Sequence, residues 1–230
     1  MIRLDKYIAN NSQLSRRQVQ RAARAGEISV DGVIVTDVAM KVAEDVRVMC
    51  DGVIVLTRSP LYLMLNKPRG VVCAATDPEH PTVMDLIGDN KREGLHVAGR
   101  LDIDTTGLVL LTDDGDWSHR ITSPRKGCGK VYCVDLAEPL TEDAAEQLRE
   151  GIVLRSEKKP TQPADIERVS EKKIRLTIRE GKYHQVKRML AAVGNRVVTL
   201  HREQIGAIKL DPQLDERAYR ALTTEEVKSV

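Results

Sequence analysis

The chain has 230 residues, of which 41% are hydrophobic and 30% are charged, and its formal net charge is +2 at pH 7. This length allows one large domain or two unequal ones with a substantial core. No apolar run approaches the roughly 20 residues that a membrane helix requires, and no apolar signal core follows Met1. Cys50, Cys73, Cys128 and Cys133 form no Cys-x-x-Cys pair and no zinc-type cluster. We therefore expect a soluble cytoplasmic protein with reduced thiols, no metal site and no membrane partner.

Positive charge is concentrated at the front of the chain. Through residue 25, six basic residues stand against the single acid Asp5, which gives a local net charge of +5. The basic residues are Arg3, Lys6, Arg16, Arg17, Arg21 and Arg24. Because the whole chain is close to neutral, this local excess indicates a basic patch.

Two short helices are predicted in this basic region. Apolar residues at helical spacing indicate the first helix, namely Leu4, Tyr7 and Ile8. Ser15 and Gln18 form a capping-box pattern, which predicts a second helix over residues 16–25, and Gly26 supplies its end.

Three arginines form a stripe on the second predicted helix. Arg17, Arg21 and Arg24 are spaced by four and three residues, and Val19 lies on the opposite side. A solvated helix face is the simpler interpretation of such a stripe. No acid is interleaved to pair with the arginines, however, and each of them could contact a phosphate and release counterions. We therefore favour RNA binding.

Apolar runs at residues 28–30 and 33–35 flank Asp31-Gly32 and predict a hairpin with a tight turn. The order helix, helix, hairpin, with the segments Arg3-Leu4-Asp5-Lys6, Ser15-Arg16-Arg17 and Gly26-Glu27-Ile28-Ser29-Val30-Asp31-Gly32, resembles the S4-type RNA-binding module. The resemblance covers about the first fifty residues. It implies binding to structured RNA through shape and backbone contacts, with all six basic residues as candidate RNA ligands.

A composition shift at Leu56–Pro60 predicts a linker. We therefore expect a small RNA-binding domain over residues 1–58 and a larger domain over residues 59–230. The larger domain is predicted to begin with a strand over residues 61–65 and a turn over residues 66–70.

Asp102 lies where a turn leads directly into an apolar strand. The run Leu108–Leu111 is too short for a helix and too apolar for a loop, so it predicts a buried strand. Gly107 marks a place where the backbone bends or is closely approached. Asp102 is therefore expected at the mouth of this strand, where functional sites are commonly built. For Asp104 we favour a side chain that caps the turn over a second catalytic acid.

A further strand and a helix are predicted near the end of the chain. Alternating Ile174, Leu176 and Ile178 predict a half-buried strand over residues 173–179. The helix is predicted over residues 184–193 by an apolar stripe of Val186, Met189, Leu190 and Val193. Its other face carries His184, Lys187 and Arg188, whose like charges repel. An anionic neighbour, either an RNA phosphate or a buried carboxylate, would remove that repulsion.

Four ordered segments of the larger domain resemble the motifs of RNA pseudouridine synthases: Asn66-Lys67-Pro68-Arg69-Gly70, Gly99-Arg100-Leu101-Asp102, Lys130-Val131-Tyr132 and Glu180-Gly181-Lys182-Tyr183-His184-Gln185-Val186-Lys187-Arg188-Met189. With the S4-like front end, the chain is most similar to the ribosomal small-subunit branch of that family. The resemblance implies isomerisation of uridine to pseudouridine in 16S ribosomal RNA without a cofactor. It also implies an α+β fold, whose larger domain has a mixed, mainly antiparallel sheet flanked by helices. We expect a monomer whose partner is 16S RNA in a small-subunit assembly intermediate.

The reaction requires a nucleophile or charge stabiliser, a cation to hold it and a proton acceptor. Asp102 is a plausible nucleophile, because an aspartate beside a cation is ionised at neutral pH. The resemblance implies that Tyr132 stacks on the uracil and accepts its proton. It also implies that the cation paired with Asp102 comes from Lys187 or Arg188, and both remain candidates.

A uridine in folded RNA must leave its stack before it can react. The resemblance assigns Arg100 to fill the vacated space, and Arg202 and Lys130 to line the substrate cleft. Structural roles are favoured for Lys67, near the site, and for Trp117, in the core.

Two other functions are compatible with parts of the sequence. The segment Asp102-Ile103-Asp104-Thr105-Thr106 fits the Asp-x-Asp-x-Thr signature of magnesium-dependent haloacid-dehalogenase-like phosphatases. In those enzymes the apolar strand precedes the nucleophile, whereas here it follows. A non-catalytic ribosomal RNA-binding assembly factor is the third interpretation.

Overall fold

The computed structural model describes residues 1–12, 14–43, 46–57, 59–88, 94–123 and 126–230. These residues divide into two units, Met1–Pro60 and Leu61–Val230. Arg58, where we placed the domain boundary, lies outside the described residues. Within the described ranges no helix is both long and apolar enough to cross a membrane.

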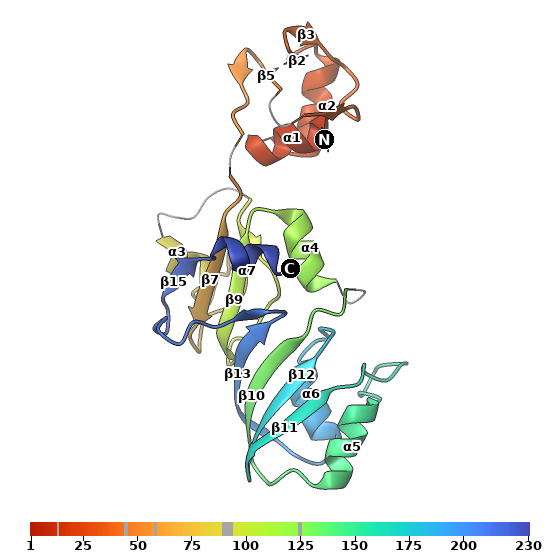
Figure 1. Cartoon of the computed structure of the whole chain (residues 1–230), viewed down its shortest axis with the longest axis vertical. Coiled ribbons are helices and arrows are strands. Elements are labelled where there is room, and N and C mark those ends of the chain that lie inside the picture. Colours follow the sequence, from red (N-terminus) through yellow and green to blue (C-terminus); the bar gives the residue numbers. More distant parts are fainter. Residues whose placement is uncertain (13, 44–45, 58, 89–93, 124–125) are drawn as a thin grey trace. The chain divides into compact units, whose positions relative to one another are not determined.

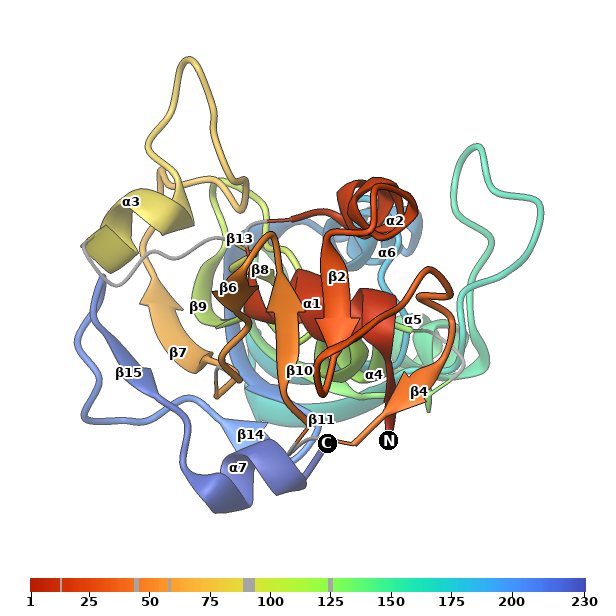
Figure 2. The same cartoon turned by 90° about the horizontal axis from the view of Figure 1, so that it is seen from above.

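The first unit packs two helices against a small antiparallel sheet. Its elements are β1 (Ile2–Arg3), α1 (Leu4–Asn11), α2 (Arg16–Arg24), β2 (Ile28–Val30), β3 (Val33–Ile34), β4 (Lys41–Val42), β5 (Val48–Cys50) and β6 (Val53–Ile54). Helix α2 begins with the predicted capping box, in which Ser15 and Gln18 exchange side-chain and backbone hydrogen bonds. The predicted hairpin is present as β2 and β3. Figure 2 shows β2 and β5 side by side, running in opposite directions.

A repeat that we did not predict builds this sheet. The pentapeptide Asp-Gly-Val-Ile-Val occurs at residues 31–35 and again at residues 51–55. Both copies turn a hairpin, and Asp31 and Asp51 share a left-handed φ of 49°. The first strands of the two hairpins pair with each other, so the sheet order is β3-β2-β5-β6.

Asp5 is a fully buried carboxylate that two of the predicted RNA-binding arginines hold in place. Arg3 donates to its two oxygens over 3.1 and 2.9 Å, and Arg16 Nη2 lies 2.7 Å from Oδ2. The hydrogen bond from Arg3, aided by Arg16 and opposed by burial, lowers the pKa of Asp5 to about 2. Arg16 thus links the start of α2 to α1, and Arg3 binds the same carboxylate from β1. The two side chains remain 54% and 46% exposed.

The arginine stripe lies on the solvent side of α2. Arg17, Arg21 and Arg24 are exposed, and Val19 and Ala23 are buried against the core of this unit. Within the described part of the chain, the three guanidinium groups have no hydrogen-bond or ion-pair partner.

The second unit is built on a mixed sheet. Its strands are β7 (Tyr62–Lys67), β8 (His96–Val97), β9 (Thr106–Thr112), β10 (Lys130–Leu136), β11 (Asp165–Ser170), β12 (Lys173–Ile178), β13 (Val197–Ile205), β14 (Ile208–Lys209) and β15 (Tyr219–Ala221). The main order is β11-β12-β10-β13-β9-β7-β15, with β14 on β13 and β8 on β9. Strands β13 and β9 run parallel, and the other described pairs of this sheet are antiparallel. The α+β fold with a mixed, mainly antiparallel sheet is therefore confirmed.

Helices cover both faces of this sheet. They are α3 (Val83–Ile87), α4 (Gly115–Thr122), α5 (Glu142–Glu150), α6 (Gln185–Ala192) and α7 (Thr224–Lys228). On one face, Leu108 packs with the fully buried Trp117 of α4, whose Nε1 donates to the carbonyl of Val227 in α7. Figure 1 shows α4 and α7 near β9. On the other face, Val109 packs with residues of α3, α5 and α6. The core position predicted for Trp117 is confirmed.

One predicted boundary is wrong. Asn66 and Lys67, which we expected in a turn, continue β7 and pair with Leu108 and Gly107 of β9. Backbone pairing with the central strand therefore carries this polar segment deep into the sheet, and the Lys67 side chain becomes buried.

The double substitution Arg3→Ala/Arg16→Ala should lower the unfolding free energy of the first unit by about 3 kcal/mol at neutral pH, because Asp5 would remain buried without a cation. Native-state hydrogen exchange of α1 amides in the full chain measures this loss. The double substitution Arg17→Ala/Arg21→Ala removes the same charge without touching Asp5 and should leave exchange unchanged.

The effect should depend on pH. In the wild type, the stability from the lowered pKa of Asp5 is present above the unfolded value of about 3.9. It is lost as the pH falls toward the folded value of about 2. In the Arg3→Ala/Arg16→Ala variant, burial favours the neutral carboxyl instead, so the deficit relative to wild type should shrink on acidification. A deficit that stays constant as the pH is lowered through this range would contradict this assignment.

Candidate active site

The loop that carries Asp102 joins β8 to β9 and is held by the buried ammonium group of Lys67. Lys67 Nζ donates to the carbonyls of Thr105 (2.8 Å), Pro68 (2.9 Å) and Ile103 (3.4 Å). Burial lowers the pKa of Lys67. The role of this side chain is therefore structural, as expected, because its donors are directed to backbone oxygens.

Arg202 of β13 holds the same loop from its other end. The residue is 1% exposed, and its three side-chain nitrogens donate to the carbonyls of Leu108 (2.8 Å), Gly99 (2.8 Å) and Arg100 (3.2 Å). The predicted place of Arg202 in the cleft is found, but its guanidinium group binds backbone oxygens there.

Gly107 allows the backbone of β9 to approach the backbone of β13 closely at Arg202. A Cβ at residue 107 would lie 2.4 Å from the carbonyl oxygen of Arg202, and the φ of Gly107 is +100°. Glycine is therefore required here for both space and conformation. This close approach accounts for the glycine that marked the strand mouth in the sequence.

Lys187 of α6 pairs with Asp102. Its Nζ lies 3.0 Å from Asp102 Oδ2 and 2.5 Å from Asp104 Oδ1. Burial acts to lower the pKa of Lys187, but the two carboxylates outweigh it and raise the pKa. Burial likewise opposes the lowering of the Asp104 pKa, which the hydrogen bond from Lys187 produces. Asp104 thus shares the cation of Asp102, a role that the predicted turn cap did not anticipate.

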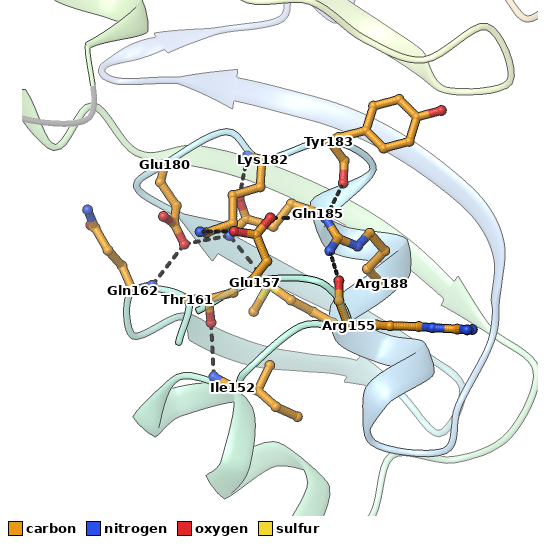
Figure 3. Close-up of polar contacts among 11 residues, drawn as sticks. Ile152, Arg155, Glu157, Thr161, Gln162, Glu180, Lys182, Tyr183, Gln185 and Arg188 are labelled. Atoms are coloured by element: carbon orange, nitrogen blue, oxygen red, sulfur yellow. Dashed lines mark hydrogen bonds and ion pairs between the residues drawn. The ribbon is translucent and has the colours of Figure 1, made fainter. Parts of the chain in front are cut away.

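Arg188, the other candidate partner of Asp102, points elsewhere. Its Nη1 donates to the carbonyl of Tyr183 (3.0 Å) and lies 3.5 Å from Glu157 Oε1, and its Nη2 donates to the carbonyl of Arg155 (2.6 Å). Figure 3 shows this network at the start of α6. Of the two candidates, Lys187 is therefore the partner of Asp102, and Arg188 does not pair with it. Partly exposed carboxylates remove the repulsion on the cationic helix face.

Asp102 and Tyr132 line one cleft of about 830 Å³. Arg100, Lys130 and Arg202 line it as well. Tyr132 is 7% exposed, and its hydroxyl accepts a hydrogen bond from Arg202 Nη1 over 3.4 Å. The cleft therefore joins a carboxylate, a buried aromatic ring and several cations, a set suited to a polar planar ligand.

The two other predicted substrate ligands differ in their surroundings. Arg100 is exposed at the cleft. Lys130 is buried, and its Nζ donates to the carbonyls of Cys128 (2.9 Å) and Ile121 (3.5 Å). Burial lowers the pKa of Lys130. The donors of Lys130 are thus directed to the backbone, whereas the guanidinium group of Arg100 is open to solvent.

His184 also lies at the site, although the sequence placed it only on the cationic face of the predicted helix and gave it no role there. Its Nε2 lies 3.6 Å from Asp102 Oδ1, on the side away from Lys187 Nζ, which contacts Oδ2. His184 stands at the N-cap position of α6 in a left-handed conformation, with φ 47° and ψ 38°, and its side chain makes no capping hydrogen bond. Its position three residues before Lys187, on one helix face, was the signal that could have found it.

The phosphatase interpretation does not fit this fold. Asp102 precedes β9, and the sheet around it is mainly antiparallel, whereas that interpretation requires a doubly wound parallel sheet. Asp114, in the acidic pair that follows β9, caps α4 and is not free to serve as a further catalytic acid. Among the described residues, no group of three or more His, Cys, Asp or Glu side chains is placed to hold a metal ion.

Known protein families match both parts of the chain, and known relatives match it over its full length. The family described as RNA pseudouridylate synthase matches residues 61–192, and the S4 domain matches residues 2–48. The chain is 52% identical over 230 residues to ribosomal small subunit pseudouridine synthase A of Escherichia coli (strain K12), covering 100% of both. It is 51% identical to the protein of the same name from Yersinia pestis, covering 98% of that protein. A crystal structure of a pseudouridylate synthase shares 46% identity and a TM-score of 0.73, covering 100% of this chain and 99% of that one. The chain therefore belongs to the RNA pseudouridylate synthase family and carries an S4 domain at its front.

Proposed function

We propose that this protein isomerises a specific uridine to pseudouridine in 16S ribosomal RNA. The observation that carries the proposal is the pairing of Asp102 with Lys187 in the cleft that Tyr132 also lines. Full-length similarity to proteins named ribosomal small subunit pseudouridine synthase A supports the small-subunit RNA as the substrate.

Asp102 supplies the nucleophilic oxygen. The bond between N1 of uracil and C1′ of ribose breaks, the base turns, and a bond from C5 to C1′ forms. C5 loses its proton, N1 gains one, and the bond from the Asp102 oxygen to the substrate breaks again, so that the carboxylate is restored. Because no electrons are transferred, the reaction needs no redox cofactor. Lys187 holds the charge of Asp102 in place, and the Asp104 and Asp102 carboxylates together raise the pKa of Lys187 against the effect of its burial.

Tyr132 stacks on the uracil and accepts the C5 proton. The hydrogen bond from Arg202 fixes its hydroxyl, and Arg202 is itself fixed by three backbone carbonyls. Because the Tyr132 ring is held rigidly, it can keep the uracil in position while the uracil turns over it. The exposed Arg100 occupies the space that the uridine leaves when it turns out of its stack.

The two domains have different functions, namely RNA binding and catalysis. In this proposal the domain over residues 1–58 binds RNA through Arg17, Arg21 and Arg24, with Arg3, Lys6 and Arg16 beside them. The domain over residues 59–230 carries out the reaction. The protein acts as a monomer in the cytoplasm, where it meets 16S RNA in a small-subunit assembly intermediate.

Small-subunit RNA tritiated at uracil C5 tests the reaction, because the isomerisation releases that label to water. The wild type should release tritium from one mapped position. Asp102→Asn keeps the shape of the side chain and should slow release by about a thousandfold or more. An Asp102→Asn variant that retains the wild-type rate would contradict the assignment. A wild type that binds the RNA but releases no tritium would instead identify a non-catalytic assembly factor.

The arginine stripe should set the salt dependence of RNA binding. Replacing Arg17, Arg21 and Arg24 with alanine removes three phosphate ligands, so the slope of log Kd against log salt should change by about 2 to 3. The single-turnover rate at saturating protein should not change. As a matched control, alanine at the exposed Lys159, Lys209 and Lys228 removes the same charge from the second unit. If the stripe variant kept the wild-type slope, the stripe would not contact phosphates.

A further inference from the structure

Tyr183 is a large aromatic side chain that the proposed reaction does not use. The residue is 76% exposed, whereas Tyr7 and Tyr132 are buried. Within the described residues its hydroxyl has no hydrogen-bond partner. It nevertheless lines the same cleft as Asp102. An aromatic ring left in solvent at the rim of a site has a surface that suits a planar ligand.

His184 supports this ring from one side. The two ring centres lie 3.8 Å apart, with 20° between the planes, so the rings are stacked. Adjacent residues reach this arrangement here through the left-handed backbone of His184, which is unfavourable for a residue other than glycine. The stack covers one face of Tyr183 and leaves the other to solvent.

A network of hydrogen bonds keeps the turn that carries both rings in place. Arg188 donates to the Tyr183 carbonyl over 3.0 Å and to the Arg155 carbonyl over 2.6 Å. On the other side, Lys182 Nζ lies 3.0 Å from Glu157 Oε2. Figure 3 shows the Tyr183 ring pointing away from this network while its carbonyl points into it. The turn that carries the Tyr183 and His184 rings is therefore held in place before any ligand binds.

The position of the stacked Tyr183 and His184 rings indicates which ligand they would bind. His184 Nε2 is 3.6 Å from Asp102 Oδ1, so the stacked rings begin directly beside the carboxylate that would meet the turned-out uridine. A nucleotide joined to that uridine must leave the cleft past its rim. Arg100 and Arg155 are exposed cations of the same unit and suit a phosphate backbone rather than an acidic or apolar protein surface.

We propose that Tyr183, supported by His184, is a stacking platform for an unpaired RNA base directly adjoining the target uridine. This inference rests on the proposed function, since it deepens the description of the same RNA site. Stacking on an aromatic ring tolerates any base, so the platform fixes the path of the strand and contributes affinity without reading the sequence.

The test compares affinities of RNA oligonucleotides that span the tritium-mapped uridine and carry either normal neighbours or an abasic residue at one flank. Tyr183→Ala should weaken binding of the normal RNA roughly 5- to 150-fold by fluorescence anisotropy, the equivalent of losing one base stack. Tyr183→Phe keeps the ring and should bind like the wild type. On RNA that lacks the base at the stacked flank, wild type and Tyr183→Ala should bind equally.

Two results would overturn the platform. One is equal affinity of wild type and Tyr183→Ala for the normal RNA. The other is a loss in Tyr183→Ala that persists, undiminished, when either flank is abasic, because the ring would then act without a base. Binding needs no turnover, so failure of the proposed function is read separately. If the wild type releases no tritium, the oligonucleotide is taken from the segment that the protein protects from hydroxyl radicals.

Discussion

The site depends on two buried cations, Lys67 and Arg202, which hold the Asp102 loop by hydrogen bonds to its backbone carbonyls. Lys67 donates to Thr105 near the end of the loop, and Arg202 donates to Gly99 near its start and to Leu108 in β9. A buried cation paired with a carboxylate would be neutralised. Carbonyls satisfy the hydrogen bonds and leave the positive charge in place. The loop is thereby rigid, and the cleft that it borders is electropositive beside Asp102. A functional anion, on the substrate or on the protein, is favoured at such a place.

Helix geometry decides which cation completes this arrangement. Consecutive helical residues point about 100° apart, so Lys187 and Arg188 are directed toward different neighbours. Lys187 faces the Asp102 loop, and Arg188 faces Glu157 and the turn that begins the helix. The first residues of α6 therefore have two separate roles. Lys187 holds the reactive carboxylate, and Arg188 holds the backbone that places the rings at the rim.

Local features were predictable from the sequence because they follow from short-range rules. The capping box at Ser15, the apolar strand over residues 108–111 and the apolar stripe of α6 are all found as expected. The identity of the cation beside Asp102 was not predictable, because it depends on the rotation of α6 against a loop 85 residues away in sequence. Burial of Arg202 was likewise hidden, because a lone arginine in a strand gives no sign of which carbonyls it will meet.

Asp102 and Lys187 act as one catalytic unit in the proposed reaction. A double-mutant cycle on the single-turnover rate tests this coupling most directly. Asp102→Asn, Lys187→Met and the double variant would be compared with wild type on one RNA. If the ammonium group acts only through the carboxylate, the double variant should be no slower than Asp102→Asn alone. If the two losses multiply instead, Lys187 acts independently of Asp102, and the two side chains do not form a catalytic unit.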